Sequence, residues 1–232
     1  VSNYYAFAAI KTDGSVVTWG DADYGGDSSG VASSLTSDVS SIVSNNSAFA
    51  AIKEDGSVVT WGYADRGGDS SSVASSLSSG VSSIVSNDYA FAALKTDGSV
   101  VTWGRDSYGG DSSSVADSLT NVSSIVGNAF AFAAIKSDGS VVTWGESFYG
   151  GDSSSVESSL SSGVSSIVSN NLAFAALKTD GSVVTWGHSS YGGDSSAVAS
   201  SLSSGVSSVV SNESSFAAIK ADGSVVTWGS EH

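Results

Sequence analysis

The stretch FAALKTDGSVVTWGRDSYGG, at residues 91 to 110, carries the pattern that decides the fold. Its octapeptide DGSVVTWG occurs six times without a change, and successive copies start 41 or 42 residues apart, at Asp13, Asp55, Asp97, Asp138, Asp180 and Asp222. A fixed period of this length is typical of a repeat protein, in which each unit packs against its neighbours. Five complete units run from residue 7 to residue 215, and a partial sixth follows.

Each unit contains three segments with strand composition. In one copy they are residues 80–86, 90–95 and 99–104, which are rich in β-branched residues or alternate Phe with Ala. Asp97-Gly98 predicts a tight hairpin turn between the second and third segments, because Gly tolerates the positive φ that the turn demands. The connector at residues 111–119 begins with Asp and Ser, which favour helix N-caps, and predicts a short helical turn at the sheet edge.

Three strands in every 42 residues are typical of a propeller blade, since stacked blades cover faces that a lone sheet leaves exposed. We predict an all-β fold: a single β-propeller domain over residues 1–232, with six blades, three antiparallel strands per blade and a short helical turn in each connector. The repeated aromatic residues are expected to form the core between blades. They are Trp19, Trp61, Trp103, Trp144, Trp186 and Trp228, with Phe7, Phe49, Phe91, Phe132, Phe174 and Phe216.

The run at residues 91–110 resembles the repeat of the regulator of chromosome condensation family, whose blades carry Leu, Asp-Gly, Val and Trp-Gly in this order. The short period and the preceding Gly-Val-x-x-Ile are most similar to a secreted bacterial propeller that inhibits β-lactamases. The resemblance implies the propeller fold but no single function, because members act as nucleotide exchange factors, ubiquitin-ligase modules and enzyme inhibitors. The chain lacks the longer blades and basic surface of the nuclear members, which argues against exchange activity and nucleosome binding.

Composition argues against several classes of function. Eight Lys and Arg against 23 Asp and Glu give a net charge of −15, which disfavours nucleic acid and anionic membrane surfaces. No apolar run approaches the roughly 20 residues that a membrane helix needs. The chain has no Cys and only two His, His188 and His232, and no Ser has a base and an orienting third group in a recognisable pattern. We therefore expect no catalysis, no cofactor and no metal site.

Two segments vary between the copies: the residues after each Trp-Gly and the residues after each Ser-Asn or Gly-Asn. The antiparallel order of the strands places both segments at the same rim of the blades, and all eight Tyr lie in them. Varied, Tyr-rich loops on a constant frame are typical of interaction surfaces. The candidate binding residues are Tyr4, Tyr5, Tyr63, Arg66, Tyr89, Arg105, Phe130, Phe148 and His188.

The sequence therefore predicts a non-enzymatic protein-binding or assembly module, extracellular or on a cell surface, whose partner is a protein or another copy of the chain. The acidic balance favours a partner with basic groups. Two alternatives stay open. One is a multivalent lectin-like propeller in which an aromatic residue and a nearby Asp or Asn hold a glycan in each blade. The other is a purely structural repeat whose incomplete terminal units are completed by neighbouring chains.

Overall fold

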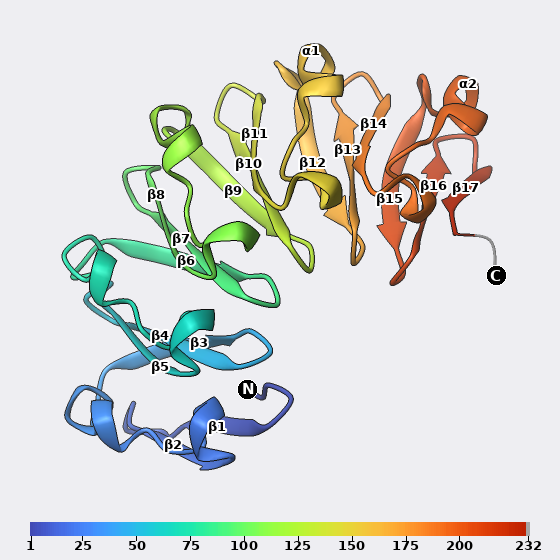
Figure 1. Cartoon of the computed structure of the whole chain (residues 1–232). Helices are drawn as coiled ribbons and strands as arrows, with labels where there is room; N and C mark the ends of the chain where they lie inside the picture. The colour runs from blue at the N-terminus through green and yellow to red at the C-terminus, as the bar shows by residue number, and fades with distance from the viewer. Residues whose placement is uncertain (231–232) are drawn as a thin grey trace. The chain divides into compact units, whose positions relative to one another are not determined.

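The computed structural model describes residues 1–230, so His232 lies outside the described residues. The chain divides into two compact units, unit 1 (Val1–Ala116) and unit 2 (Asp117–His232) (Figure 1). Each unit is built of antiparallel sheets, one for each repeat, and we call each sheet a blade. The prediction of a single domain over residues 1–232 stays a prediction.

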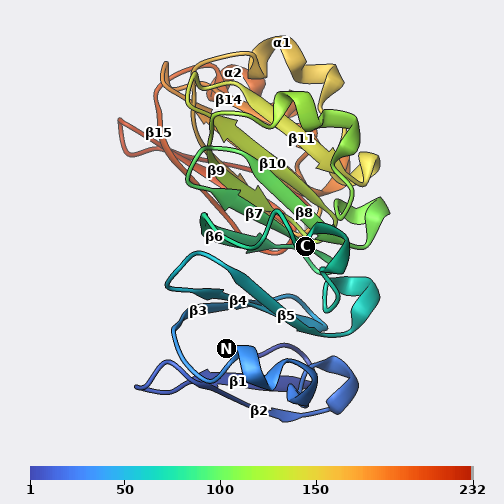
Figure 2. The same ribbon diagram turned by 90° about the vertical axis from the view of Figure 1, so that its left-hand side faces the viewer.

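Unit 1 contains three sheets, and each strand pairs with the next one along the chain. They are β1 (Ala6–Ile10) with β2 (Val16–Gly20); β3 (Val39–Ser44), β4 (Ala48–Lys53) and β5 (Val58–Gly62); and β6 (Val81–Ser86), β7 (Ala90–Lys95) and β8 (Val100–Gly104). The first sheet has only an isolated bridge, Ser2 with Phe7, where the others have a third strand. Figure 2 shows these sheets following one another within unit 1.

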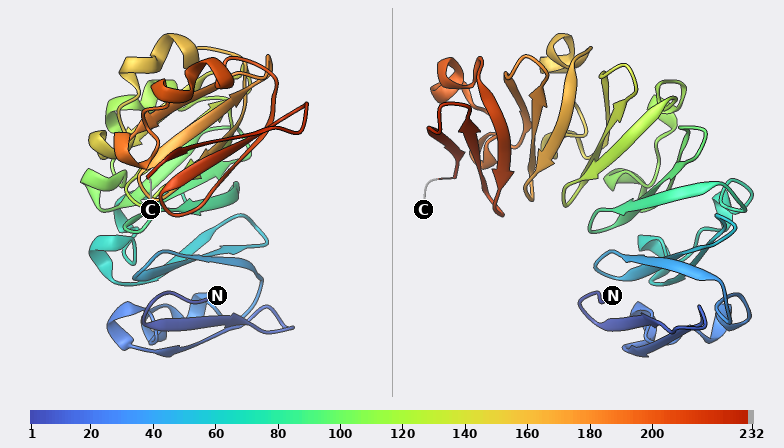
Figure 3. Two further views of the ribbon diagram at one scale, coloured as in Figure 1. Left: turned by 90° about the vertical axis from the view of Figure 1, so that its right-hand side faces the viewer. Right: turned by 180° about the vertical axis from the view of Figure 1, so that it is seen from behind.

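Unit 2 contains three further sheets of three strands each (Figure 3). They are β9 (Val122–Gly127), β10 (Ala131–Lys136) and β11 (Val141–Gly145); β12 (Val164–Ser169), β13 (Ala173–Lys178) and β14 (Val183–Gly187); and β15 (Val206–Ser211), β16 (Ser215–Lys220) and β17 (Val225–Gly229). The all-β class, the six repeats and the strand segments are thereby confirmed. The two-stranded β1–β2 sheet is the one exception among the described sheets to three strands per blade.

The Asp-Gly turn has the same geometry in all six copies. In β7–β8 the Gly98 amide donates to the Lys95 carbonyl at 2.9 Å, and Gly98 has a φ of 80°. Oδ1 of Asp97 accepts from the amide of Ser99 at 2.9 Å and from its hydroxyl at 2.6 Å. The constant Asp-Gly-Ser sequence thus supplies both the left-handed residue and the side-chain bonds that close the hairpin.

Each connector contains two helical turns, of which the sequence predicted only the second. The first turns follow Trp-Gly directly: η1 (Ala22–Tyr24), η3 (Ala64–Arg66), η5 (Asp106–Tyr108), η7 (Ser147–Tyr149) and η9 (Ser189–Tyr191). The second are η2 (Ser29–Ser34), η4 (Ser71–Val73), η6 (Ser113–Ser118), η8 (Ser154–Val156) with α1 (Glu157–Leu160), and η10 (Ser196–Val198) with α2 (Ala199–Leu202). The connector Asp, not Ser, anchors the second turn, as Oδ1 of Asp111 accepts from the Ser113 amide at 2.8 Å.

The cores lie between consecutive blades of a unit. We call the face of a blade that carries its Phe and Trp the leading face, and the opposite face the trailing face. The leading face of β6–β8 packs Phe91 and Trp103 against Ala48 and Ala50 on the trailing face of β3–β5. The two rings stack at 5.3 Å, and Phe91 is fully buried at 0% exposure. The same packing joins β1–β2 to β3–β5 in unit 1, and β9–β11 to β12–β14 and β12–β14 to β15–β17 in unit 2.

The prediction of core positions is wrong for one pair of aromatic residues. Phe7 and Trp19 stack on each other at 5.3 Å but remain 48% and 50% exposed. They lie on the leading face of β1–β2, and no earlier blade of unit 1 supplies a trailing face to cover them. The sequence motif is therefore the same as elsewhere, but its environment differs.

Equivalent Phe residues in different environments give a direct test of this packing. We expect Phe91→Ala to lower the free energy of unfolding by about 3–5 kcal/mol, because it leaves a cavity among buried groups. Phe7→Ala removes a half-exposed ring and should cost only about 1 kcal/mol. Urea unfolding followed by circular dichroism measures both, and equal losses would contradict the assignment of the cores.

The hydrogen bonds of the turn Asp residues lead us to expect that the free energy of unfolding falls in acid. Hydrogen bonds from Ser99, first from its hydroxyl and then from its amide, lower the pKa of Asp97 below its ordinary value of 3.8. The same cause lowers the pKa of the other turn residues, Asp13, Asp55, Asp138, Asp180 and Asp222. A lowered folded-state pKa contributes stability that is complete above the ordinary pKa and is lost as the pH falls through the folded value.

We therefore expect the urea midpoint to fall as the pH drops below about 4. Combining Asp55→Asn, Asp97→Asn and Asp180→Asn keeps a neutral acceptor in three turns and should flatten this dependence. The matched control changes three exposed acidic residues outside the turns, Asp65, Asp117 and Glu157, to the corresponding amides. An equally steep pH dependence in the turn variant and the control would refute the role of these turns.

Candidate functional site

The two varied segments of each repeat are joined by backbone hydrogen bonds. The Arg105 amide, just after β8, donates to the Tyr89 carbonyl, just before β7, at 3.0 Å. The equivalent pairs are Asp21 with Tyr5, Tyr63 with Ser47, Glu146 with Phe130 and His188 with Leu172. Both segments therefore lie at the same end of each blade, and we call the surface they form the varied rim.

An Asn side chain fixes the geometry of the varied rim in five repeats. Oδ1 of Asn87 accepts from the amides of Tyr89 and Ala90 at 2.9 and 2.7 Å, and its Nδ2 donates to the Tyr108 carbonyl at 2.6 Å. One side chain thus ties the second varied segment to the first. Asn3, Asn45, Asn128 and Asn170 make the same bridge in their repeats. This role was not predicted from the sequence, although the Asn recurs before every second varied segment.

Within a unit, the next blade supports the first varied segment. Gly67 ends the η3 turn with a φ of 95°, and a Cβ added there would lie 2.6 Å from the ring of Phe91. Its carbonyl accepts from Nε1 of Trp103 at 3.1 Å. Only Gly fits this place, because both the backbone conformation and the ring below exclude a side chain. The loop therefore rests on the buried aromatic pair of the following blade.

Aromatic and guanidinium groups form a continuous row along the varied rim of unit 1. Tyr5 and Tyr24 have ring centroids 4.2 Å apart, and Tyr24 stacks with Tyr63 at 5.7 Å. Tyr4 meets Tyr5 edge-on at 6.3 Å. The row passes between repeats, because Tyr63 belongs to the loop after β5 and Tyr24 to the loop after β2.

Arginine continues this row where one tyrosine is missing from the pattern. Arg66 occupies the position that Tyr24 and Tyr108 hold in neighbouring repeats. Its guanidinium carbon lies 5.6 Å from the centroid of Tyr63 and 4.8 Å from that of Tyr89. Its Nη1 also donates to Oγ of Ser47 at 2.9 Å. Cation–π contact therefore replaces ring stacking at this point.

The row of unit 1 also contains a second arginine. Arg105 lies 6.0 Å from the centroid of Tyr89 and 5.1 Å from that of Tyr108, and the two rings are 4.8 Å apart. Six of the predicted site residues are thus brought together in one row: Tyr4, Tyr5, Tyr63, Arg66, Tyr89 and Arg105. Tyr24 and Tyr108 complete it, although they are not among the candidate binding residues predicted from the sequence.

Unit 2 carries a second row. Phe130 packs on Tyr149 at 4.7 Å, and the ring of His188 lies 4.8 Å from Phe148 and 5.1 Å from Tyr191. This row brings together the other three predicted residues, Phe130, Phe148 and His188. Phe148 is exposed, and Nδ1 of His188 is buried without a hydrogen-bond partner among the described residues. Tyr149 and Tyr191 also belong to this row, although they are not among the candidate binding residues predicted from the sequence.

One carboxylate of unit 1 is partly withdrawn from water at the rim. Burial raises the pKa of Asp88 above its ordinary value, while a hydrogen bond from Asn46 and the charge of Arg66 act in the opposite direction. Asp88 precedes Tyr89 directly in the sequence. The positive charge of Arg66 is thus partly balanced within the rim itself.

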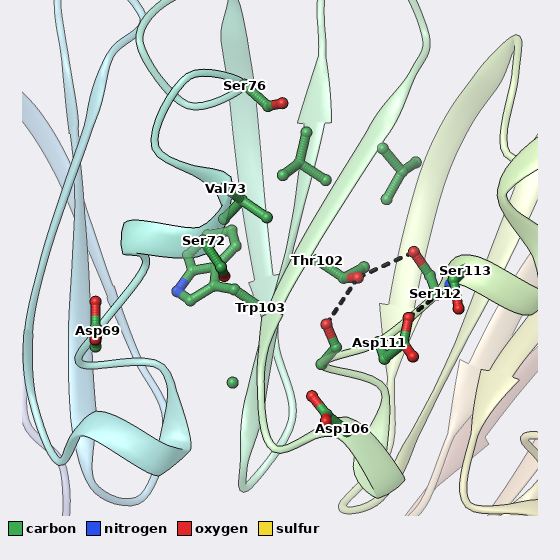
Figure 4. Close-up of a pocket in the computed structure, with 14 residues that line it drawn as sticks. Asp69, Ser72, Val73, Ser76, Thr102, Trp103, Asp106, Asp111, Ser112 and Ser113 are labelled. Carbon is green, nitrogen blue, oxygen red and sulfur yellow. Dashed lines mark hydrogen bonds between the residues drawn. The ribbon is translucent and has the colours of Figure 1, made fainter.

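Figure 4 shows a groove beside β8, the third strand of its blade. The groove beside β8 has a volume of about 440 Å³ and is lined by Asp69, Trp103 and Asp111 among others. Oγ1 of Thr102 donates to the Gly110 carbonyl at 3.1 Å and lies 3.0 Å from Oγ of Ser112. Trp103 is only 2% exposed, so it offers no open ring for a sugar to stack on. This groove therefore lacks the aromatic platform that the lectin-like alternative needs, whereas the equivalent groove beside β14, of about 590 Å³, is lined by the exposed ring of Phe148.

Within residues 1–230, no cluster of three or more His, Asp or Glu side chains is arranged to hold a metal ion. No helix in this part of the chain has the length and apolar character required to cross a membrane.

Comparison with known proteins identifies the blades. The model of the regulator of chromosome condensation (RCC1) repeat matches residues 81–109, which include β6, β7, β8 and the η5 turn. No curated protein matches the sequence.

Solved structures share the fold at low sequence identity. Yeast RCC1 (Prp20), in its complex with Kap60, has a TM-score of 0.54 and 15% identity over 98% of this chain and 68% of its own. Prp20p of Saccharomyces cerevisiae, in a structure reported with its binding to Gsp1p and histones, has a TM-score of 0.51 and 16% identity over 82% of this chain. The ectodomain of the Physcomitrella patens receptor kinase CR4 has a TM-score of 0.51 and 15% identity over 98% of this chain.

The blades are therefore those of a β-propeller, and the chain is built from RCC1-like propeller repeats. Its matched region spans 60% of the receptor kinase ectodomain and 56% of Prp20p.

The buried Asn bridge can be tested apart from the core. We expect Asn87→Ala to lower the free energy of unfolding by about 2 kcal/mol, since it leaves buried backbone groups without partners. Hydrogen exchange at the Tyr89 and Ala90 amides should become faster, because both donate to the lost side chain. The control is Asn171→Ala, which changes an exposed Asn in the equivalent loop of unit 2. Unchanged exchange at Tyr89 and Ala90 would show that the bridge does not order the rim.

Proposed function

We propose that this protein is a non-enzymatic interaction module that binds a protein partner through its varied rims. The observation that carries the proposal is the packing of the two aromatic rows. Tyr63 is held between Tyr24 and Arg66, and Tyr89 between Arg66 and Arg105, before any partner is present. Side chains held in this way lose little conformational freedom on binding, so more of the contact energy appears as affinity.

The distribution of variation supports the same proposal. The turns at the opposite end of the blades repeat Asp-Gly-Ser in every copy, whereas the rim loops vary at most positions other than the Tyr that precedes Gly-Gly in four of five copies. Tyr and Arg are enriched where proteins bind other proteins, since they combine a large contact area with a polar end. Tyr4, Tyr5, Tyr63 and Phe148 are exposed and available for such contacts.

The structural relatives are consistent with an interaction role. Prp20p is described with binding to Gsp1p and histones, and as a complex with Kap60. A shared fold alone does not determine the partner, whereas charge and ring chemistry restrict it. A net charge of −15 and open Tyr rings favour a protein surface that offers Lys or Arg among apolar groups.

We place this activity outside the cell or at the cell surface. The receptor kinase relative is an ectodomain, which gives one example of similar blades in that location. The low charged content and the absence of Cys agree with any compartment, so the fold analogy is the main support.

The test combines three rim substitutions, Tyr63→Ala, Tyr89→Ala and Phe148→Ala. Immobilised wild-type protein is exposed to extracellular and surface protein fractions, and bound polypeptides are located on the chain by cross-linking and mass spectrometry. We expect capture to fall at least tenfold in the triple variant, with cross-links in the wild type confined to the varied rims.

The matched control changes three residues of the opposite turns, Lys53→Ala, Thr96→Ala and Lys178→Ala. It should bind as the wild type does. Circular dichroism and the urea midpoint establish that both variants are folded. Equal capture by the triple variant and the wild type would refute the proposal. Binding of the wild type to a glycan array through the grooves beside the third strands would favour the lectin-like alternative.

A further inference from the structure

Two blade faces in the described chain remain uncovered and apolar. The leading face of β1–β2 presents Phe7, Val17 and Trp19, of which Trp19 is 50% exposed. We call it the first face. The trailing face of β15–β17 presents Val210, Ile219 and Val225, with Val225 at 59% exposure, and we call it the last face.

These two faces are the two halves of the contact that joins neighbouring blades. Between β3–β5 and β6–β8 the leading face supplies Phe91, Val101 and Trp103, which are the equivalents of Phe7, Val17 and Trp19. The trailing face supplies Val43, Ile52 and Val58, which are the equivalents of Val210, Ile219 and Val225. A first face and a last face therefore match position by position.

The last face also has a hollow where an aromatic ring belongs. A cavity of about 250 Å³ is lined by Ser215, Ala217 and Thr227 among others. Ser215 and Ala217 are the equivalents of Ala48 and Ala50, against which Phe91 and Trp103 pack inside unit 1. The hollow therefore has the lining of the seat that a Phe-Trp pair fills between consecutive blades.

A repeated hydrogen bond gives the same contact a defined register. Where the first, inner strand of a blade ends in Ser, its hydroxyl donates to the preceding repeat, as Ser86 does to the Ser44 carbonyl at 2.8 Å and Ser211 does to the Ser169 carbonyl at 2.7 Å. Ser2 is the equivalent donor on the first face, and the Ser211 carbonyl is the equivalent acceptor on the last face. The apolar side chains and the hydrogen-bonding groups of the first face and the last face thus match in one register.

We infer that a second copy of this chain covers these surfaces, with the last face of one copy packed on the first face of another. The contact is heterologous, so each copy uses a different surface and keeps one surface free for a further copy. Association buries aromatic and aliphatic groups that are now half exposed, which supplies the driving force. This self-association goes beyond the proposed function, because it uses blade faces and leaves the varied rims open.

The contact is smaller than a complete contact between blades. The contact between β3–β5 and β6–β8 also contains Leu77, from the connector, and Val81 and Ile84, from the inner strand β6. The first sheet has only the Ser2–Phe7 bridge in place of the full inner strand. We therefore expect reversible association that depends on protein concentration and weakens when either face gains a charge.

The experiment measures the mass of the 232-residue chain by sedimentation over a wide range of concentrations. The wild type should rise above 23.0 kDa as concentration increases. Trp19→Glu alters only the first face and Val225→Glu only the last face, and each variant alone should stay at the mass of one chain. An equimolar mixture of the two should reach twice that mass and no more, since it contains one intact face of each kind.

Controls keep these outcomes decisive. Thr96→Glu adds the same charge to an exposed turn and should associate as the wild type does. Because both altered side chains are largely exposed, circular dichroism should be unchanged, and Val17→Glu replaces Trp19→Glu if that variant unfolds. A wild type that stays at 23.0 kDa at every concentration, variants that associate as the wild type does, or a mixture that stays monomeric would each overturn the inference. Rim variants that abolish partner capture should leave the mass unchanged, so the two proposals fail independently.

Discussion

The structure depends on one packing arrangement, in which the Phe-Trp pair of a blade lies against the small residues of the blade before it. Phe91 and Trp103 fit because Ala48, Ala50 and Gly67 leave room for two rings. The two rings contribute buried apolar surface, and Nε1 of Trp103 adds a directional hydrogen bond to the Gly67 carbonyl. The same two side chains thus fill the core and hold the loop of the previous repeat, which explains why Trp-Gly and Gly-Gly do not vary between copies.

A loop that is anchored at both ends can tolerate variation between them. The Asn bridge, the backbone bond between the two segments and the Gly seat leave about four residues free in each first varied segment. Arg66 shows the extent of this freedom, since it takes a Tyr position and still continues the row through its guanidinium group. The frame sets the spacing of the side chains, and the varied residues set their chemistry.

The strands and hairpins were predictable because their signals are local: alternating residues, Asp-Gly at the turn and a constant period. The helical turn after Trp-Gly was not, because its sequences ADY, ADR, DSY, SFY and SSY share only a final Tyr in four of the five copies, and the turn is imposed by the anchors around it. The exposure of Phe7 could not be read from a motif identical to its buried copies. The varied segments were identified from the sequence, but the rows that join them depend on contacts between repeats, and these place Tyr24, Tyr108, Tyr149 and Tyr191 beside the predicted residues.

The bond from each Trp to the preceding loop gives the chain a direction. In unit 2, Trp228 holds the loop that ends at Gly192, and Trp186 holds the loop that ends at Gly150. If β15–β17 frayed, the loop at residues 188–191 would lose its seat, whereas no loop of unit 1 rests on Trp19. Local unfolding of a later blade therefore loosens the varied loop of the repeat before it as well as its own, whereas unfolding of β1–β2 loosens only its own varied segments. Each of these loops is thus ordered by contacts with the next repeat along the chain. A partner bound to one loop therefore stabilises the repeat that follows it.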